Sequence, residues 1–448
     1  MRETRTVQTS IFDCYSQHEF GTHLKNLSAL LDEHPEILPL LERDLIADNC
    51  KEAGRTGQSV ESIFRCMLLK QMLGLSYELL SFHLSDSLSY RTFARIRASE
   101  SPSRSALQAN IRSIRPETLE TIFRLLAAKG FRQGDFNLEK IRIDSTVVKS
   151  NIASPSDSQL LNDSVRVLSR YLAKSQSMTG VKIRFKDFRK ASRSLACRIF
   201  YAKKAEKALL YEELLPVTVK VMRQVEQAIA KVRSQSPAHL ALATSAWIDD
   251  LEHYYDLAAR VLDQTQRRII GKEKVPSSEK IVSLFEEHTD IIIKGSRDID
   301  YGHKINIASD AQGLLTSVFI EKGNPSDVER YFPVLDDHNS LYGCVPETVA
   351  TDGGYASLAN LEAGKAMGIK RPVFHKKKGL TLTAMGVKQK TYHALRNFRA
   401  GIEGNISELK RAYGLGKALW KKNDGFEAYV WASVLSYNLT RLVRLRSG

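Results

Sequence analysis

The stretch Arg399-Ala400-Gly401-Ile402-Glu403-Gly404-Asn405-Ile406-Ser407-Glu408-Leu409-Lys410-Arg411 has the periodicity of an amphipathic helix. Its apolar residues Ile402, Ile406 and Leu409 recur at i, i+4 and i+7, so they form one stripe. Glu403 lies beside that stripe, and the spacing lets Arg399 and Lys410 approach the same face. A carboxylate between two cations is also typical of a solvated ion pair. The role of this helix therefore depends on residues elsewhere in the chain.

Two aspartates upstream each follow a segment with β-strand character. Asp144 follows Ile141-Arg142-Ile143, and Asp352 follows Thr348-Val349-Ala350-Thr351. Taken alone, each is more often structural, as a helix cap or as the start of an Asp-Gly turn. Two aspartates at strand ends and one glutamate on a helix can nevertheless converge and hold divalent metal. We therefore predict Asp144, Asp352 and Glu403 as catalytic, metal-binding residues.

Such a carboxylate set fits phosphodiester chemistry. Two Mg²⁺ (or Mn²⁺) ions about 3.5–4 Å apart activate a water or hydroxyl and neutralise charge on the attacking and leaving oxygens. Hard oxygen ligands suffice for these ions, so neither Cys nor His is required. The five cysteines are scattered and never in CxxC spacing, which favours neither a disulfide framework nor a zinc ribbon. Gly353-Gly354 would let the backbone approach a phosphate closely.

The charge balance indicates a polyanionic partner. The 448-residue chain has 66 Lys+Arg against 51 Asp+Glu, a net charge of +15, and nucleic acid is the most frequent partner of such a chain. No apolar run approaches the roughly 20 residues of a membrane helix, and the N-terminus lacks the apolar core of a secretory signal. We expect a cytoplasmic, nucleoid-associated protein that binds double-stranded DNA and no membrane.

The predicted strands and helices define an α/β fold. A strand over 138–143 is separated by a long helical region from two antiparallel strands over 303–308 and 314–320, which are joined by a turn at 309–313. A helix from 324, a strand ending at Asp352, a helix, a strand over 370–374 and the Glu403 helix follow. The order βββαβαβα is that of an RNase H-like core with a mixed sheet, interrupted after its first strand by a large helical insertion.

Four regions follow from this pattern. They are leader helices over 1–57, an all-α domain over 58–135, the catalytic domain over 136–153 plus 297–448, and the basic helical insertion over 154–296. Inside the insertion we predict a basic helix over 181–214 and a last helix over 277–287. The short helices of 58–135 and its arginines, which we expect to be exposed (Arg91, Arg95, Arg97 and Arg104), are compatible with a helix-turn-helix DNA-binding domain, and equally with an ordinary helical domain.

The insertion holds a dense run of positive charge. Between residues 182 and 207, ten lysines and arginines face only Asp187 and Glu206, with aromatic residues interleaved. Runs of charge are usually solvated faces. The length of this one and the basic balance of the chain favour contact with a phosphate backbone. We assign that contact to Arg189, Lys190 and Arg193.

The chain resembles bacterial insertion-sequence transposases of the DDE superfamily, close to the ISNCY group. The resemblance rests above all on Thr351-Asp352-Gly353-Gly354-Tyr355 and on residues 401–411. Weaker support comes from other segments: 5–12, Gly74-Leu75-Ser76-Tyr77, Asp144-Ser145-Thr146, 283–290, Gly302-His303-Lys304 and Gly323-Asn324-Pro325.

The resemblance implies a role for each matching residue. Asp144, Asp352 and Glu403 match the three catalytic carboxylates, and Arg399 and Lys410 match cations that contact the transposon end. Arg396 stands where the family has a tyrosine, which leaves that tyrosine's DNA contact without an equivalent. We add Arg396, Lys376 and Lys377 as candidate phosphate contacts; the alternative for the two lysines is a solvated turn.

The implied activity is transposition. The protein would bind the terminal inverted repeats of an insertion sequence, cut at the element's end with Mg²⁺, and join the 3′-hydroxyl to target DNA, acting as a homodimer or larger assembly. Two alternatives remain open. One is a metal-dependent nuclease without strand transfer, and the other is a transposase-derived DNA-binding protein without catalysis.

Overall fold

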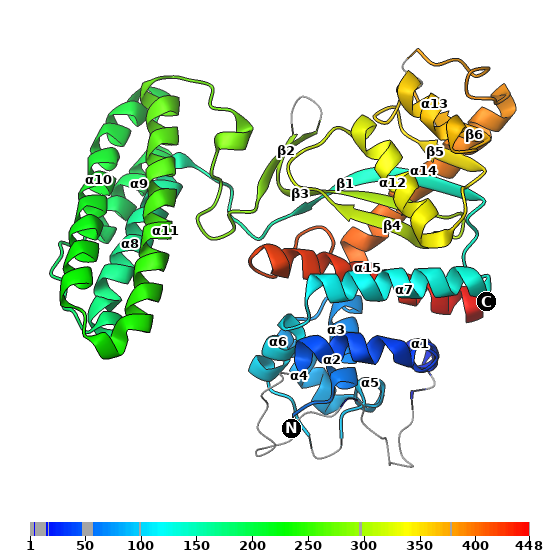
Figure 1. Cartoon of the computed structure of the whole chain (residues 1–448), viewed down its shortest axis with the longest axis horizontal. Coiled ribbons are helices and arrows are strands. Elements are labelled where there is room, and N and C mark those ends of the chain that lie inside the picture. Colours follow the sequence, from blue (N-terminus) through cyan, green and yellow to red (C-terminus); the bar gives the residue numbers. More distant parts are fainter. Residues whose placement is uncertain are drawn as a thin grey trace. The chain divides into compact units, whose positions relative to one another are not determined.

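The computed structural model describes residues 4, 15–16, 18–46, 57–97, 100–294, 298–376 and 379–447. The chain divides into two compact units, one of 1–151 with 292–448 and one of 152–291 (Figure 1). The sequence predicts the insertion over 154–296, and the second unit has the bounds 152–291. The segment 5–12 lies outside the described residues. No helix among those that are described is long and apolar enough to cross a membrane.

The first unit combines a mixed sheet with helices. Its strands are β1 (Lys140–Lys149), β3 (Asp298–Ser309), β4 (Leu315–Ile320), β5 (Thr348–Thr351) and β6 (Arg371–Phe374), and β2 (Asp290–Lys294) lies at its boundary. Its helices are α1 (Glu19–Asp32), α2 (Leu38–Leu45), α3 (Val60–Met72), α4 (Tyr77–Asp86), α5 (Leu88–Ala94), α6 (Arg104–Arg112), α7 (Pro116–Gln133), α12 (Asp327–Tyr342), α13 (Leu358–Ala366), α14 (Gln389–Ala412) and α15 (Asn423–Ser447).

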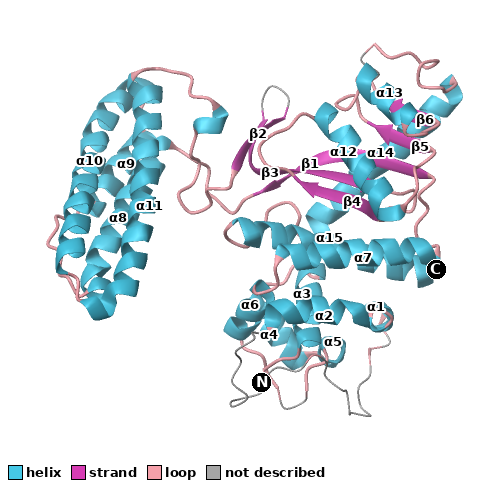
Figure 2. Ribbon diagram, viewed as in Figure 1, coloured by secondary structure: helices cyan, strands magenta, loops and turns pink. Residues whose placement is uncertain are grey.

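The sheet has the order β2-β3-β1-β5-β6, with β4 also paired to β3 (Figure 2). β1 runs antiparallel to β3 and parallel to β5, β5 runs parallel to β6, and β3 runs antiparallel to β4. The core order β4-β3-β1-β5-β6, with these directions, is that of an RNase H-like sheet. The predicted hairpin and the two parallel strands are present. β2 was missed, because Ile291-Ile292-Ile293 is too short to distinguish from a buried helical turn.

The first strand is longer than predicted. We expected it to end at Asp144, but β1 continues to Lys149 and pairs with β3 from Arg142 opposite Ser309 to Lys149 opposite Gly302. The β-branched residues Thr146, Val147 and Val148 favour this extension. Asp144 therefore lies inside a strand and not at its end.

The second unit is a helical bundle of α8 (Asp157–Thr179), α9 (Arg189–Tyr201), α10 (Lys204–Gln235) and α11 (Ala241–Thr265). Its core includes Leu168, Val225 and Trp247. The predicted basic helix over 181–214 is wrong in its bounds. Residues 181–188 are not helical, and the helix is interrupted between the end of α9 at Tyr201 and the start of α10 at Lys204.

The helix predicted over 277–287 is also wrong, since only Ser277–Glu279 forms a short 3₁₀ turn. Side chains satisfy the backbone there. The Gln264 carboxamide bonds both the N–H and the C=O of Ile281, and the Ser283 hydroxyl accepts from the N–H groups of Phe285 and Glu286. Such local bonds compete with helix formation.

Within the first unit, the N-terminal helices pack against α15, which in turn packs against the sheet. One hydrophobic cluster joins residues of α1, α3 and α7 with α15 and the β3–β4 hairpin. Arg95, expected on the surface, is largely buried instead. It bonds Glu61 at 2.6 Å and Asp32, and the buried Arg65 joins the same two carboxylates. This arginine therefore stabilises the helical packing through its ion pairs.

The β3–β4 turn is held by a buried carboxylate. The Asp310 side chain accepts from the N–H of Leu314 at 2.9 Å and of Asn137 at 3.2 Å. Gly313, at φ 85°, completes the turn in a left-handed conformation. Burial raises the pKa of Asp310 from 3.8 to about 6, with backbone hydrogen bonds acting in the opposite direction.

This shift predicts a pH-dependent cost. Because the folded pKa is raised, the folded state loses stability relative to the unfolded chain as pH rises from about 4 through about 6. The free energy of unfolding of Asp310→Asn, relative to wild type, should therefore increase by on the order of 2 kcal/mol between pH 4 and pH 7. Denaturant unfolding at several pH values measures the difference. Glu139→Gln, an exposed carboxylate nearby, is the control, and a flat Asp310 difference would contradict the assignment.

Candidate active site

The strand register brings Asp144 and Asp352 together. β1 pairs in parallel with β5, from Lys140 opposite Thr348 to Ile143 opposite Thr351. The next residue on each strand is one of the two aspartates. Neighbouring strands lie about 4.8 Å apart, so residues 208 positions apart in sequence become neighbours at one place in the sheet.

One guanidinium connects the sheet to the helix that carries Glu403. Arg399 on α14 bonds Asp144 through Nη2–Oδ2 at 2.7 Å and Glu403 through Nη1–Oε1 at 2.6 Å. The Arg399 and Asp144 side chains are 13% and 14% exposed, whereas Glu403 is 62% exposed. Arg399 thus lies between two of the three predicted carboxylates.

Asp352 organises a tight turn beside them. Its Oδ1 accepts from the N–H of Gly354 at 2.7 Å. A Cβ at Gly353 would lie 2.7 Å from the His375 carbonyl and 3.0 Å from the Lys376 Cβ. Close packing therefore requires a glycine at position 353. Burial first, and then Arg399 and Arg396, lower the pKa of His375, which places these cations at the same corner.

A fourth carboxylate faces the turn. A Cβ at Gly354 would lie 2.8 Å from Asp327 Oδ2 and 2.9 Å from Asp352 Oδ1. Asp327 is the first residue of α12, and its Oδ1 lies 2.6 Å from Lys304 Nζ, which also donates to the Pro325 carbonyl at 2.7 Å. Sequence reasoning treated Asp327 as part of a helix start. No periodicity links it to Asp352, so spacing alone could not have found it.

The buried side chain of Tyr355 joins β1 to β3 near the two aspartates. The Tyr355 hydroxyl donates to Asn306 Oδ1 at 2.7 Å and also bonds the Ser145 side chain. Burial raises the pKa of Tyr355, and the charges of Asp327, Asp144 and Asp352 act in the same direction. This hydroxyl therefore stays neutral and ties β1 to β3 directly behind Asp144.

Arg142 on β1 sets the distance between α14 and the sheet through hydrogen bonds to that helix. It lies two residues before Asp144 on the same strand, so both side chains point to the same face. Its guanidinium donates to the Phe398 carbonyl and to Asn405 Oδ1, each at 3.0 Å. Asn405 in turn donates to the Gly313 carbonyl at 2.7 Å. A Cβ at Gly401 would overlap Arg142 Nη1.

Carboxylate oxygens are the ligands that a hard divalent cation prefers, and Asp144, Asp352 and Glu403 would supply them. Their present arrangement is that of an ion-pair cluster. Among the described residues, no group of three or more His, Cys, Asp or Glu side chains is placed to share an ion. Arg399 and a cation would compete for the same oxygens of Asp144 and Glu403.

The predicted cationic residues fall in both units. In the first unit Arg396 and Lys376 are exposed, Lys377 lies outside the described residues, and Lys410 is on α14 about 10 Å along the helix axis from Glu403. In the second unit Arg189, Lys190 and Arg193 are exposed. Arg189 is already paired with Asp187 at 2.6 Å.

The mixed sheet has the strand order of an RNase H-like fold, with Asp144 on β1, Asp352 directly after β5 and Glu403 on α14. Two family models match this chain: a transposase DDE domain over residues 294–439 and a transposase domain (DUF772) over residues 13–113. No curated protein and no solved structure matches it. The two matches together support an insertion-sequence DDE transposase. Asp352 and Glu403 lie inside the first match, and Asp144 lies outside both.

The packing of α14 on Arg142 predicts opposite effects of two alanine substitutions on one helix. Gly401→Ala should destabilise the protein by about 1–3 kcal/mol, because its methyl group overlaps a buried guanidinium. Gly404→Ala, where a Cβ meets nothing within 4 Å, should be neutral or stabilising by up to about 1 kcal/mol. Thermal unfolding measures both. Equal effects of the two substitutions would contradict the packing described.

Proposed function

We propose that this chain is an active DNA transposase that uses Asp144, Asp352 and Glu403 to cut DNA at the ends of an insertion sequence. The proposal is supported by two contacts. Ile143 pairs with Thr351, so the two aspartates follow paired residues, and Arg399 bonds both Asp144 and Glu403. Three neighbouring carboxylates repel one another unless cations neutralise them.

The residues around the corner divide into two roles. Asp144, Asp352 and Glu403 would hold Mg²⁺ or Mn²⁺, which supply an activated water and neutralise phosphate oxygens. Arg399, Arg396, Lys376 and Lys410 would pair with the DNA backbone. Glu403 is mostly exposed, so its side chain has room to move away from Arg399, whose guanidinium would then be available to a phosphate.

The full reaction has two phosphodiester steps. Hydrolysis at the element's end would release a 3′-hydroxyl, and that hydroxyl would attack target DNA in line, with the target's 3′-oxygen leaving. Binding to terminal inverted repeats would involve residues 58–130 and the cations of the second unit. A homodimer or larger assembly would bring two ends together.

Two substitutions at the corner should separate cutting from binding. Asp144→Asn and Glu403→Gln should each lower Mg²⁺-dependent cleavage at least about a hundredfold, because a neutral amide is a poor ligand for the cation. Binding to an end fragment should change little. Gel assays with labelled DNA from the flanks of the gene measure both. Glu408→Gln is the control, since Glu408 lies on α14 but pairs with Arg444. Cleavage at wild-type rate by either variant would remove that residue from the site.

The same assay, scored for joined products, distinguishes transposition from hydrolysis alone. We expect the wild-type protein to yield both cleaved ends and ends joined to an unlabelled target. Cleaved ends without joined products would instead establish a nuclease that lacks strand transfer.

A further inference from the structure

The second unit displays two neighbouring aromatic side chains where α9 ends. Phe200 and Tyr201 are 72% and 79% exposed, and their rings meet edge to face with centroids 5.0 Å apart. Leu209, in the second turn of α10, is 63% exposed. Leaving several large apolar groups in water is unfavourable. An exposed apolar cluster of this kind typically marks a binding surface.

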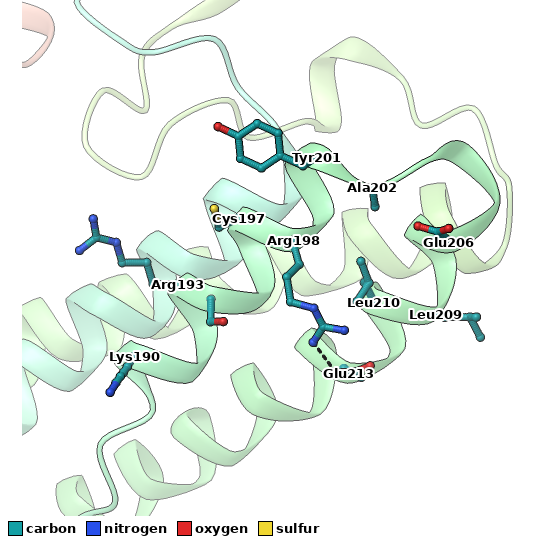
Figure 3. Close-up of a pocket in the computed structure, with 11 residues that line it drawn as sticks. Lys190, Arg193, Cys197, Arg198, Tyr201, Ala202, Glu206, Leu209, Leu210 and Glu213 are labelled. Atoms are coloured by element: carbon teal, nitrogen blue, oxygen red, sulfur yellow. Dashed lines mark hydrogen bonds and ion pairs between the residues drawn. The ribbon is translucent and has the colours of Figure 1, made fainter.

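A groove of about 910 Å³ lies between α9 and α10 beside these residues (Figure 3). Tyr201, Cys197, Arg193 and Lys190 line it from α9, and Leu209 and Leu210 line it from α10. The groove also has two acidic residues: Glu213, which pairs with Arg198 at 3.4 Å, and Glu206, which is flanked in sequence by Lys203, Lys204 and Lys207.

The periodicity of α9 separates this face from the core. Ser192, Leu195, Ala196 and Ile199 are buried in the bundle. Lys190, Arg193, Cys197 and Tyr201 recur at i, i+3, i+7 and i+11 on the opposite side. They form a stripe about 16 Å long, with cations at one end and an aromatic ring at the other.

We propose that this α9–α10 groove binds unpaired DNA, with phosphates along Lys190 and Arg193 and a base stacked on Tyr201. Proteins bind single strands by combining a basic track with exposed aromatic rings. Contact with duplex phosphates alone would not require the rings. A protein interface would be depleted in lysine and other charge at its core, whereas Lys190, Arg193 and Arg198 line this groove. The inference rests on the proposed function for its ligand, because a strand cut at the element's end is free to separate from its complement.

Equilibrium binding of the full-length chain to a fluorescent 20-nucleotide oligothymidylate, without metal, tests the groove. Tyr201→Ala and the Phe200→Ala/Tyr201→Ala pair should weaken this binding at least about fivefold, the effect of losing one stacked base. Affinity for a duplex of equal length should change less than twofold. Leu242→Ala removes a side chain that is 88% exposed in the same unit but outside the groove, and it should bind as wild type.

Alkylation of Cys197 gives a second readout. Its thiol is exposed and lines the groove. At an oligothymidylate concentration near the wild-type Kd, the Cys197 thiol of wild type should therefore be protected from N-ethylmaleimide more than that of Tyr201→Ala. Mass spectrometry of its peptide measures the modified fraction, and unchanged thermal unfolding shows that the variant is folded.

Unchanged oligothymidylate binding by Tyr201→Ala, or unprotected Cys197 in wild type, would overturn the inference. A variant with altered oligomeric state and unaltered DNA binding would also overturn the inference, because the aromatic residues would then contact a second copy of the chain. Cleavage of DNA ends is scored separately, so its absence in wild type would count against the proposed function alone.

Discussion

The candidate site depends on the contacts by which Arg142 holds helix α14 against the sheet. The Arg142 guanidinium reaches beneath α14 and bonds Phe398 and Asn405, and only a glycine at position 401 leaves room for it. Arg142 is two residues from Asp144, so the strand that carries one catalytic candidate also fixes the helix that carries another. The height of α14 decides whether Arg399 and Glu403 can reach Asp144 at all.

A second constraint comes from the sheet. Parallel pairing of β1 with β5 makes Asp144 and Asp352 neighbours, although the second unit separates β1 from the rest of the sheet in sequence. Tyr355 and Asn306 tie the strands together behind the aspartates, and the Lys304–Asp327 pair closes the opposite side of the Gly354 turn. These buried polar contacts hold the carboxylates close together despite their mutual repulsion.

Patterning predicted the parts of the site that local sequence encodes. Residue spacing predicted the apolar stripe of α14, the β3–β4 turn and the strand before Asp352. From these elements Arg399, Glu403 and Asp352 were identified as candidates. Contacts made across the fold were not readable. Nothing in the sequence links Asp327 to Asp352, Gly401 to Arg142, or Arg95 to Asp32. The helix expected over 277–287 failed for the same reason, since Gln264 takes the backbone bonds of Ile281.

We propose that Asp144, Asp352 and Glu403 share divalent metal. A crystal structure of the protein with Mn²⁺, measured at the manganese absorption edge, would locate the bound ions. We expect anomalous difference density between the three carboxylates, with the Arg399 guanidinium moved away from Asp144 and Glu403. Manganese bound elsewhere, or Arg399 still bridging the two carboxylates at saturating metal, would contradict it.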